Sequence, residues 1–216
     1  MTAPAAPGRF ITFEGGEGAG KSTHIGRLAA SLGERGVPLL VTREPGGSDG
    51  AEEIRRLLVT GATDRWDPVG EALLHFAARR DHVERRVRPA LAAGNWVLCD
   101  RFADSTMAYQ GYGHGLGRAS IEALSRLVLG DFAPDLTILL DLPVAEGLAR
   151  AAGRSGNEDR YERMDTDFHE RLRLGFLEIA AGAPDRCVLI DATPAVDEVA
   201  ARILETVEAR LGILRR

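Results

Sequence analysis

A glycine-rich segment near the start of the chain carries the most evident chemistry. It reads Gly15-Gly16-Glu17-Gly18-Ala19-Gly20-Lys21-Ser22-Thr23 and fits G-x-x-x-x-G-K-[ST]. A short apolar run precedes it and a helical pattern follows, which is the context that this motif requires. Backbone N–H groups that open a helix can converge on phosphate oxygens, and glycines let the backbone approach them closely. The segment therefore predicts binding of a nucleoside triphosphate.

Individual roles within this segment follow from the side chains. Lys21 is expected to reach the outer phosphates, and the Ser22 hydroxyl is expected to bind a Mg²⁺ that keeps most of its waters. Asp100 ends the apolar run Trp96–Cys99, where its carboxylate can hold the same metal or its waters. A strand-terminating aspartate in a turn is the alternative for Asp100. The predicted nucleotide-binding residues are Gly15, Gly16, Gly18, Ala19, Gly20, Lys21, Ser22 and Thr23.

Five short apolar runs alternate with helical patterns along the chain. The runs are Phe10–Phe13, Leu39–Thr42, Trp96–Cys99, Leu136–Leu140 and Cys187–Ile190. Continuous apolar runs indicate strands that are covered on both faces, as in a parallel sheet flanked by helices. A polar residue follows each run, at the strand end where ligands of such sheets gather. We expect a doubly wound α/β fold with a five-stranded parallel sheet.

Helical patterns fill the intervals between these runs. We expect helices over Lys21–Glu34, Val69–Ala93, Ser120–Leu129 and Val144–Ala152, and another from Phe168 to Ile179. Asp49 and Glu52 predict a capping box at the start of a further helix. Thr193-Pro194 predicts the cap and first turn of the last helix.

The composition limits the class of protein. A chain of 216 residues favours one domain, and the Ala/Pro-rich residues 1–8 are expected to form a loose tail and not a signal peptide. No apolar stretch approaches the length of a membrane span. Cys99 and Cys187 lie in apolar runs, as buried thiols do in a reducing compartment, so we expect a cytoplasmic protein. The net charge of −5 argues against a nucleic-acid partner.

The glycine-rich segment alone leaves motor, switch, pump and kinase open. Guanine-nucleotide switches normally carry Asn-Lys-x-Asp, but Trp96 follows Asn95 and Glu158 follows Asn157. Asp67–Gly70 matches D-x-x-G without an apolar run before it. A motor or transporter ATPase usually needs a larger chain, so a small phosphotransferase remains.

Several further blocks resemble bacterial thymidylate kinases. They are Phe13–Ser22, Thr42–Gly47, Phe76–Arg79 and Asp100–Gly111, with weaker matches at Pro134–Thr137 and Asp159–Glu162. The resemblance implies a P-loop nucleoside monophosphate kinase fold, with one domain over 9–216 and a lid at about 150–162. It further implies transfer of the γ-phosphoryl group of ATP to dTMP, giving dTDP and ADP in dTTP biosynthesis, with Mg²⁺ and as a homodimer. A kinase for another nucleotide or metabolite and a non-catalytic nucleotide-binding regulator are the alternatives.

The same resemblance implies roles at the reacting phosphates. Arg101 and Arg55 resemble clamps on the dTMP phosphate, and Glu17 resembles a carboxylate that contacts dTMP and positions those clamps. Lys21 bridges the transferring phosphates, and no general base is needed because the attacking phosphate oxygen is already ionised. One branch of the family has a catalytic arginine where this chain has Gly18. The other branch supplies the charge from its lid, where Arg154 and Arg160 are the favoured catalytic arginines.

Recognition of the base is implied in the same way. Arg79 resembles a donor to a thymine carbonyl, and Thr106 a partner of the ring N–H. Tyr109 resembles a tyrosine packed against the sugar, where a 2′-hydroxyl would clash, while Ser105 and Gln110 belong to the same substrate-binding set. Relatives place a stacking phenylalanine four residues before the arginine. His75 has that position here, so we expect Phe76 to stack on the base, and His75 is the alternative stacking residue. Arg80 is the fallback for Arg79, and Pro45 is cis in relatives.

Overall fold

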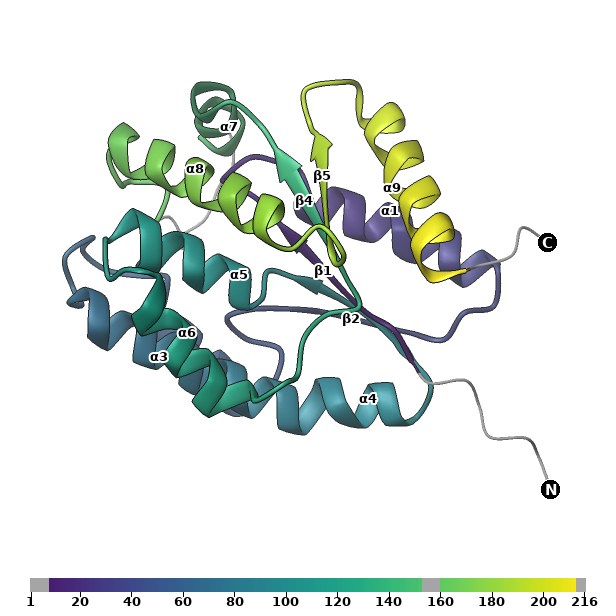
Figure 1. Cartoon of the computed structure of the whole chain (residues 1–216), viewed down its shortest axis with the longest axis horizontal. Helices are drawn as coiled ribbons and strands as arrows, with labels where there is room; N and C mark the ends of the chain where they lie inside the picture. The colour runs from purple at the N-terminus through teal and green to yellow at the C-terminus, as the bar shows by residue number, and fades with distance from the viewer. Residues whose placement is uncertain (1–7, 153–159, 213–216) are drawn as a thin grey trace.

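A five-stranded parallel sheet forms the centre of the molecule (Figure 1). The computed structural model describes residues 8–152 and 160–212. The strand order is β2-β3-β1-β4-β5. The strands are β1 (Phe10–Glu14), β2 (Leu39–Arg43), β3 (Trp96–Asp100), β4 (Leu136–Asp141) and β5 (Cys187–Asp191). Each lies where an apolar run predicted it and includes the polar residue that follows, so the predicted doubly wound sheet is confirmed.

The central strands are buried as predicted, but the edge strands are not. All five residues of β1 are buried, whereas Val41 on β2 is 51% exposed and Leu189 on β5 is 48% exposed. The prediction that every run is covered on both faces is therefore wrong for β2 and β5. An edge strand has a neighbouring strand on one side only, and the flanking helices cover it incompletely.

Helices cover both faces of the sheet, as Figure 1 shows. On one face, α1 (Lys21–Glu34) and α9 (Val196–Leu211) pack against residues of β1, β3 and β4. The other face is covered by the π-helical η1 (Val83–Val87), α4 (Arg88–Ala92), α5 (Ala103–Thr106), the π-helical η2 (Met107–Gly113) and α8 (Thr166–Gly182). The remaining helices are α2 (Asp49–Leu58), α3 (Pro68–His82), α6 (Arg118–Leu129) and α7 (Val144–Ala151), and α3 packs against α2 and α6.

The predicted helix Val69–Ala93 is one helical path in three pieces, α3, η1 and α4. Pro89 has no N–H to donate to the carbonyl four residues earlier, and the π-helical turn immediately upstream accommodates it. At the start of α3, the Asp67 carboxylate accepts the N–H groups of Val69 and Gly70. The formal D-x-x-G match is thus a helix cap.

Two predicted helix caps are wrong. Glu52 accepts the N–H of Gly47, while Ser48, which precedes α2, donates its hydroxyl to Asp81. The last helix begins at Val196, because the Thr193 N–H and hydroxyl both donate to Asp191. Glu52 and Thr193 thus each bond to a residue that precedes the helix, which competes with the predicted cap, and Ser48 bonds to a residue of α3. No helix in the described part of the chain is both long and apolar enough to cross a bilayer.

The register of the sheet brings two loops together. Phe13 of β1 pairs with Asp100 of β3, so the residues that follow both strands leave the sheet side by side. The glycine-rich segment 15–23 thereby lies next to Asp100 and Arg101, at the edge of the sheet where ligands were expected.

Candidate active site

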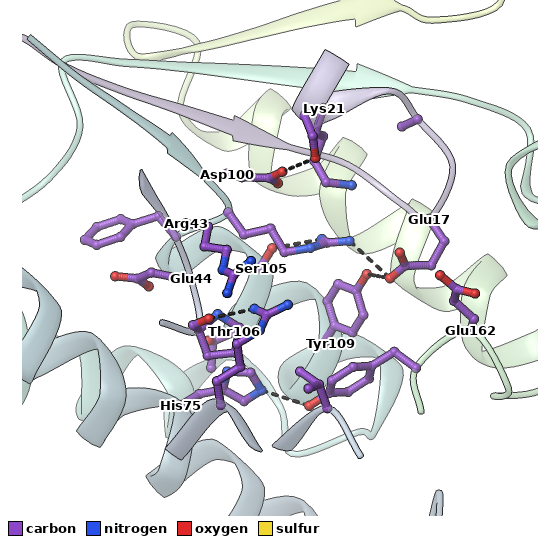
Figure 2. Close-up of a pocket in the computed structure, with 18 of the residues that line it drawn as sticks. Glu17, Lys21, Arg43, Glu44, His75, Asp100, Ser105, Thr106, Tyr109 and Glu162 are labelled. Atoms are coloured by element: carbon purple, nitrogen blue, oxygen red, sulfur yellow. Dashed lines mark hydrogen bonds and ion pairs between the residues drawn. The ribbon is translucent and has the colours of Figure 1, made fainter. Parts of the chain in front are cut away.

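A cavity of about 240 Å³ opens at the carboxyl ends of β1, β2 and β3. The glycine-rich segment lines one end, and α3 and η2 line the other. Figure 2 shows Lys21 and Asp100 at the first end and Thr106 and His75 at the second. Among the residues predicted as site residues, the cavity is lined by Glu17, Gly18, Ala19, Gly20, Lys21, Ser22, Arg55, Arg79, Asp100, Arg101, Ser105, Thr106, Tyr109 and Gln110.

Glycine is required in the segment at two close approaches. Gly15 and Gly18 have positive φ angles of 134° and 68°. A Cβ atom at Gly15 would lie 2.3 Å from the Leu140 carbonyl oxygen, and one at Gly18 would lie 2.0 Å from the Gly147 carbonyl oxygen. The loop thus packs by its backbone against β4 and α7, and position 18 has no room for an arginine side chain in this conformation.

Lys21 lies over the same loop. Its Nζ donates to the carbonyl oxygens of Gly15, at 3.1 Å, and Gly16, at 2.8 Å. Burial, together with the charge of Arg101, lowers the pKa of Lys21 to about 8. An anion bound at the loop would favour the protonated amine.

Arg101 connects the loop to the centre of the cavity. Its Nη1 donates to the Gly15 carbonyl at 3.0 Å and to Ser105 Oγ at 3.2 Å, and its Nη2 lies 3.1 Å from Glu17 Oε1. Its backbone is left-handed, with φ of 69°, and its N–H donates to the Phe13 carbonyl. A non-glycine residue in this region is strained, and these contacts hold it there. The guanidinium is thus fixed beside the loop.

Arg79 is fixed at the opposite end. Its Nε donates to Glu44 at 2.7 Å, and its Nη2 donates to the Phe102 carbonyl and to Thr106 Oγ1. His82 contacts the other oxygen of Glu44, which holds that carboxylate in place. Arg79 is 2% exposed, yet its Nη1 has no hydrogen-bond partner among the described residues. A buried donor without a partner is costly, so this atom points to a ligand acceptor.

Comparison with known proteins decides the family. A family model described as thymidylate kinase matches residues 13–203. The thymidylate kinase of Caulobacter vibrioides is 59% identical over 206 residues, which cover 95% of this chain and 99% of that protein. The chain belongs to the thymidylate kinase family.

Other members of the family agree. The thymidylate kinase of Rhizorhabdus wittichii is 53% identical over 200 residues, covering 92% of this chain and 96% of the relative. The crystal structure of thymidylate kinase from Ehrlichia chaffeensis matches with a TM-score of 0.78 at 35% identity, covering 94% of this chain and 100% of that one. As a member of this family, the chain is a nucleoside monophosphate kinase that uses ATP with Mg²⁺ and acts on dTMP.

The residues around Ser22 fit the magnesium ion that thymidylate kinases use. The Ser22 hydroxyl donates to Asp100 Oδ2 at 2.6 Å, at the junction of β3 and the loop. One hydroxyl and one carboxylate form a small set of hard oxygen donors. Mg²⁺ prefers such sites, because it keeps several waters and takes further oxygens from substrate phosphates.

Two carboxylates, the partly buried Glu17 and the fully buried Glu14, support the phosphate end of the kinase cavity. Burial alone would raise the pKa of Glu17, but Arg101 and Lys21 lower it to about 2, and Tyr109 donates its hydroxyl to the same oxygen as Arg101. Burial and the charge of Asp104 raise the pKa of Glu14 to about 7. Glu14 accepts the N–H groups of Phe102 and Ser105 and thereby orients the turn that carries Arg101.

The prediction that Phe76 lies at the cavity is wrong. Phe76 is 2% exposed and packs with Ala72 and Ile121 in the core, with its ring 5.0 Å from the Arg79 guanidinium carbon. His75 lines the cavity instead, and its Nε2 lies 2.8 Å from the Tyr161 hydroxyl. Residues three and four before Arg79 share its helix face, so helical spacing could not separate them.

The expected catalytic role of Arg160 is contradicted by its position. Arg160 is fully buried outside the cavity, where it donates to the carbonyl oxygens of Leu58, Ala62 and Thr63 and pairs with Glu71. Its guanidinium is held by the loop between α2 and α3 and does not face the phosphate end. Arg154, the other favoured arginine, and most of the expected lid at 150–162 lie outside the described residues.

Of the other predicted residues, Arg55 lies at the cavity and Arg80 does not. Arg55 lines the same cavity as Arg101, and its Nη1 donates to the Pro45 carbonyl at 2.7 Å. The Glu44–Pro45 bond is cis, as expected. Arg80 does not line the cavity, since it is largely exposed and donates to the Val128 carbonyl. Both cysteines are buried and unpaired.

Sequence reasoning missed two buried carboxylates of this site. Glu44, inside the recognised block Thr42–Gly47, orients Arg79. Glu71 contacts Gln110 and Arg160 from α3. Its spacing four residues before His75 placed it on the face of α3 that carries Arg79, and this was the available signal.

Proposed function

We propose that this kinase joins ATP and dTMP end to end in the cavity, with ATP on the glycine-rich segment and dTMP against α3 and η2. The observation that carries the proposal is the position of Arg101. Its guanidinium contacts both the phosphate loop, through the Gly15 carbonyl and Glu17, and the segment on the acceptor side, through Ser105. A fixed cation between two anionic substrates aligns them and offsets their repulsion.

The donor end binds the polyphosphate of ATP. The backbone N–H groups at the start of α1 and the Lys21 amine would hold its outer phosphates. Ser22 and Asp100 would hold the magnesium ion, which supplies positive charge to the transferring group. The glycines at 15 and 18 let the loop backbone approach the phosphates without obstruction.

The acceptor end binds the phosphate of dTMP between Arg101 and Arg55. Planar guanidinium groups bind phosphate through paired N–H donors. Such local cations are needed because the chain has a net charge of −5, which repels an anionic substrate. The attacking phosphate oxygen carries negative charge at neutral pH, so this chain supplies alignment and charge and no proton acceptor. Glu17, ionised between Arg101 and Tyr109, keeps the Arg101 guanidinium oriented.

The base would be recognised at the far end of the cavity. Arg79 Nη1 would donate to a thymine carbonyl, and Thr106, which accepts from Arg79 Nη2 and lines this end of the cavity, would accept the ring N–H. The half-buried His75 takes the stacking position that the sequence assigned to Phe76. Tyr109, whose hydroxyl is bonded to Glu17, would pack against the sugar, where a 2′-hydroxyl would clash.

Phosphorylation assays with dTMP, dUMP, UMP and CMP side by side test this assignment. We expect ADP release that depends on the monophosphate, with dTMP preferred. Preference for another monophosphate would contradict the substrate assignment. Tight ATP binding without dTMP-dependent ADP release would instead identify a regulator.

We also propose a homodimer formed through α2, α3 and α6. The proposal is supported by exposed apolar residues on these helices, which pack side by side: Leu73 on α3 is 50% exposed, Leu127 on α6 is 81% exposed, and Leu57 on α2 is 38% exposed. Exposed apolar side chains gathered on one group of helices favour association. Sedimentation equilibrium should give twice the chain mass, and Leu73→Glu should shift the protein to monomer.

Three finer assignments complete the proposal. The kinase domain spans 9–216 with a tail before it, residues 150–162 form its lid with Arg154 as the catalytic arginine, and the protein works in the cytoplasm. The last assignment is supported by the two buried free thiols. Limited proteolysis with and without both substrates tests the lid, since closure should protect it.

A further inference from the structure

Glu71 is a buried carboxylate that the reaction does not use. It lies on α3 with a side chain that is 1% exposed. Gln110 Nε2 lies 2.6 Å from its Oε1, His114 Nε2 lies 3.4 Å from the same oxygen, and Arg160 Nη1 lies 2.5 Å from Oε2. A buried ion is stable only when it is well paired, so these three neighbours hold Glu71 in one position.

The contact with Gln110 determines which way its amide faces. Burial alone would raise the pKa of Glu71, but the adjacent His114 and the charges of His75 and Arg160 lower it to about 2, so the carboxylate is ionised. An ionised carboxylate only accepts hydrogen bonds. The amide atom of Gln110 beside it must therefore be the nitrogen, which turns the amide oxygen away from Glu71.

The amide oxygen is left for a ligand. Gln110 is fully buried and lines the cavity, and its Oε1 has no hydrogen-bond partner among the described residues. Arg79 also lines this end of the cavity, and its Nη1 is a buried donor that likewise has no hydrogen-bond partner among the described residues. The cavity thus offers one fixed acceptor and one fixed donor to the acceptor base.

We propose that Glu71 is a positioning residue for base selection, which locks the Gln110 amide with its oxygen toward the base. This inference rests on the proposed function. Thymine and uracil carry a ring N–H, which the Gln110 oxygen would accept beside the Thr106 hydroxyl, next to a carbonyl oxygen, which Arg79 would bind. In the same orientation, cytosine presents a ring acceptor to Gln110 and an amino donor to Arg79, so both protein groups are mismatched. An amide that could turn over would offer its N–H₂ group to cytosine and lose this discrimination.

The test is a double-mutant cycle with dTMP and dCMP as substrates. Glu71→Gln keeps the size of the side chain but can donate to Gln110, so the Gln110 amide can turn over. We expect the kcat/KM ratio for dTMP over dCMP to fall at least about tenfold, while KM for ATP stays unchanged. Gln110→Leu removes the reader and should lower the same ratio. Glu71→Gln added to Gln110→Leu should lower it no further.

Each outcome supports or overturns the inference. An unchanged ratio in Glu71→Gln, or an equal fall in the Gln110→Leu background, would overturn it, because the effect of Glu71 would not pass through Gln110. If Glu71→Gln fails to fold, Glu71→Met decides, since it also frees the Gln110 amide while Arg160 keeps its three carbonyl partners. An unchanged ratio there overturns the inference, and a lowered ratio that is not lowered further by Gln110→Leu supports it. A wild-type protein without dTMP-dependent ADP release would contradict the proposed function separately.

Discussion

The Ser22 hydroxyl lies 2.6 Å from Asp100 Oδ2, although 78 residues separate the two in the chain. Parallel pairing of β1 with β3, with Phe13 opposite Asp100, produces this relationship. A hydroxyl at the start of α1 and a carboxylate at the end of β3 give Mg²⁺ a small oxygen site that leaves room for phosphate oxygens and water.

Removing the charge from this pair should impair the metal-dependent step. We expect Asp100→Asn to lower kcat about a hundredfold and to raise the Mg²⁺ concentration for half-maximal rate, because electrostatic stabilisation of the transferring group depends on it. Ser22→Thr keeps the hydroxyl and is the matched control, with near-normal turnover. A magnesium titration at saturating ATP measures both. An Asp100→Asn enzyme with a normal magnesium dependence would show that the metal is held elsewhere.

Arg101 should be essential for turnover. Arg101→Ala removes the cation between the two phosphates, and we expect kcat/KM for dTMP to fall by about three orders of magnitude or more. Arg101→Lys keeps the charge but loses the planar pair of donors, so it should recover only part of the loss. Steady-state kinetics with both substrates varied gives the measurement. Activity of Arg101→Ala within about twofold of wild type would place the clamp at another residue.

Binding of ATP should become weaker above pH 8. The pKa of Lys21 is about 8 in the free protein, so a rising pH removes the proton that a bound polyphosphate requires. The apparent affinity should fall about tenfold between pH 7.5 and 9, with uptake of nearly one proton on binding at pH 9. Calorimetry in two buffers of different ionisation enthalpy measures this uptake. Lys21→Arg stays charged and should show no such slope, whereas a slope in that variant would assign the effect to another group.

His75 should make the folded state sensitive to acid. Burial and the charge of Arg79 lower the pKa of His75 to about 4, below its ordinary value of 6.5, although Glu71 opposes this. Because the unfolded chain takes up the proton first, this contribution to stability is present above pH 6.5 and is lost between pH 6.5 and 4.

His75→Phe removes this titration. The loss of unfolding free energy between pH 7.5 and 5 should therefore be up to about 2 kcal/mol smaller in the variant than in wild type. Urea denaturation at the two pH values measures the difference. Equal losses in both proteins would exclude His75 as the titrating group.

Arg160 should stabilise the fold, because its guanidinium binds three carbonyl groups and pairs with Glu71. Arg160→Met leaves the buried Glu71 charge without this partner, which costs about 3–5 kcal/mol of unfolding free energy. Arg85→Met removes a guanidinium that is 73% exposed and pairs with Asp81, and should cost less than about 1 kcal/mol. Urea denaturation compares the two variants. Equal, small losses would show that the Arg160 contacts add nothing to stability.

The chain itself determined the sheet and the phosphate-binding loop. Apolar runs separated by helical patterns determine which segments become strands, because only a sheet covered by helices buries them. The spacing in 15–23 determines a loop whose glycines adopt positive φ and pack against the Leu140 and Gly147 carbonyls. The location of Asp100 and Arg101 at the ligand-binding edge was determined in the same way, since a parallel sheet brings the carboxyl ends of all its strands to one edge.

Only the tertiary structure decided which side chains at the acceptor end face the cavity. His75 and Phe76 share a helix face with Arg79, and the packing of Phe76 on Ile121 resolved the choice. Arg160 lies in a segment resembling the lid, yet carbonyl groups about a hundred residues away hold it. The orientation of the Gln110 amide depends on Glu71, 39 residues earlier. These outcomes depend on buried polar groups finding partners from distant segments, and sequence spacing carries no information about those distances.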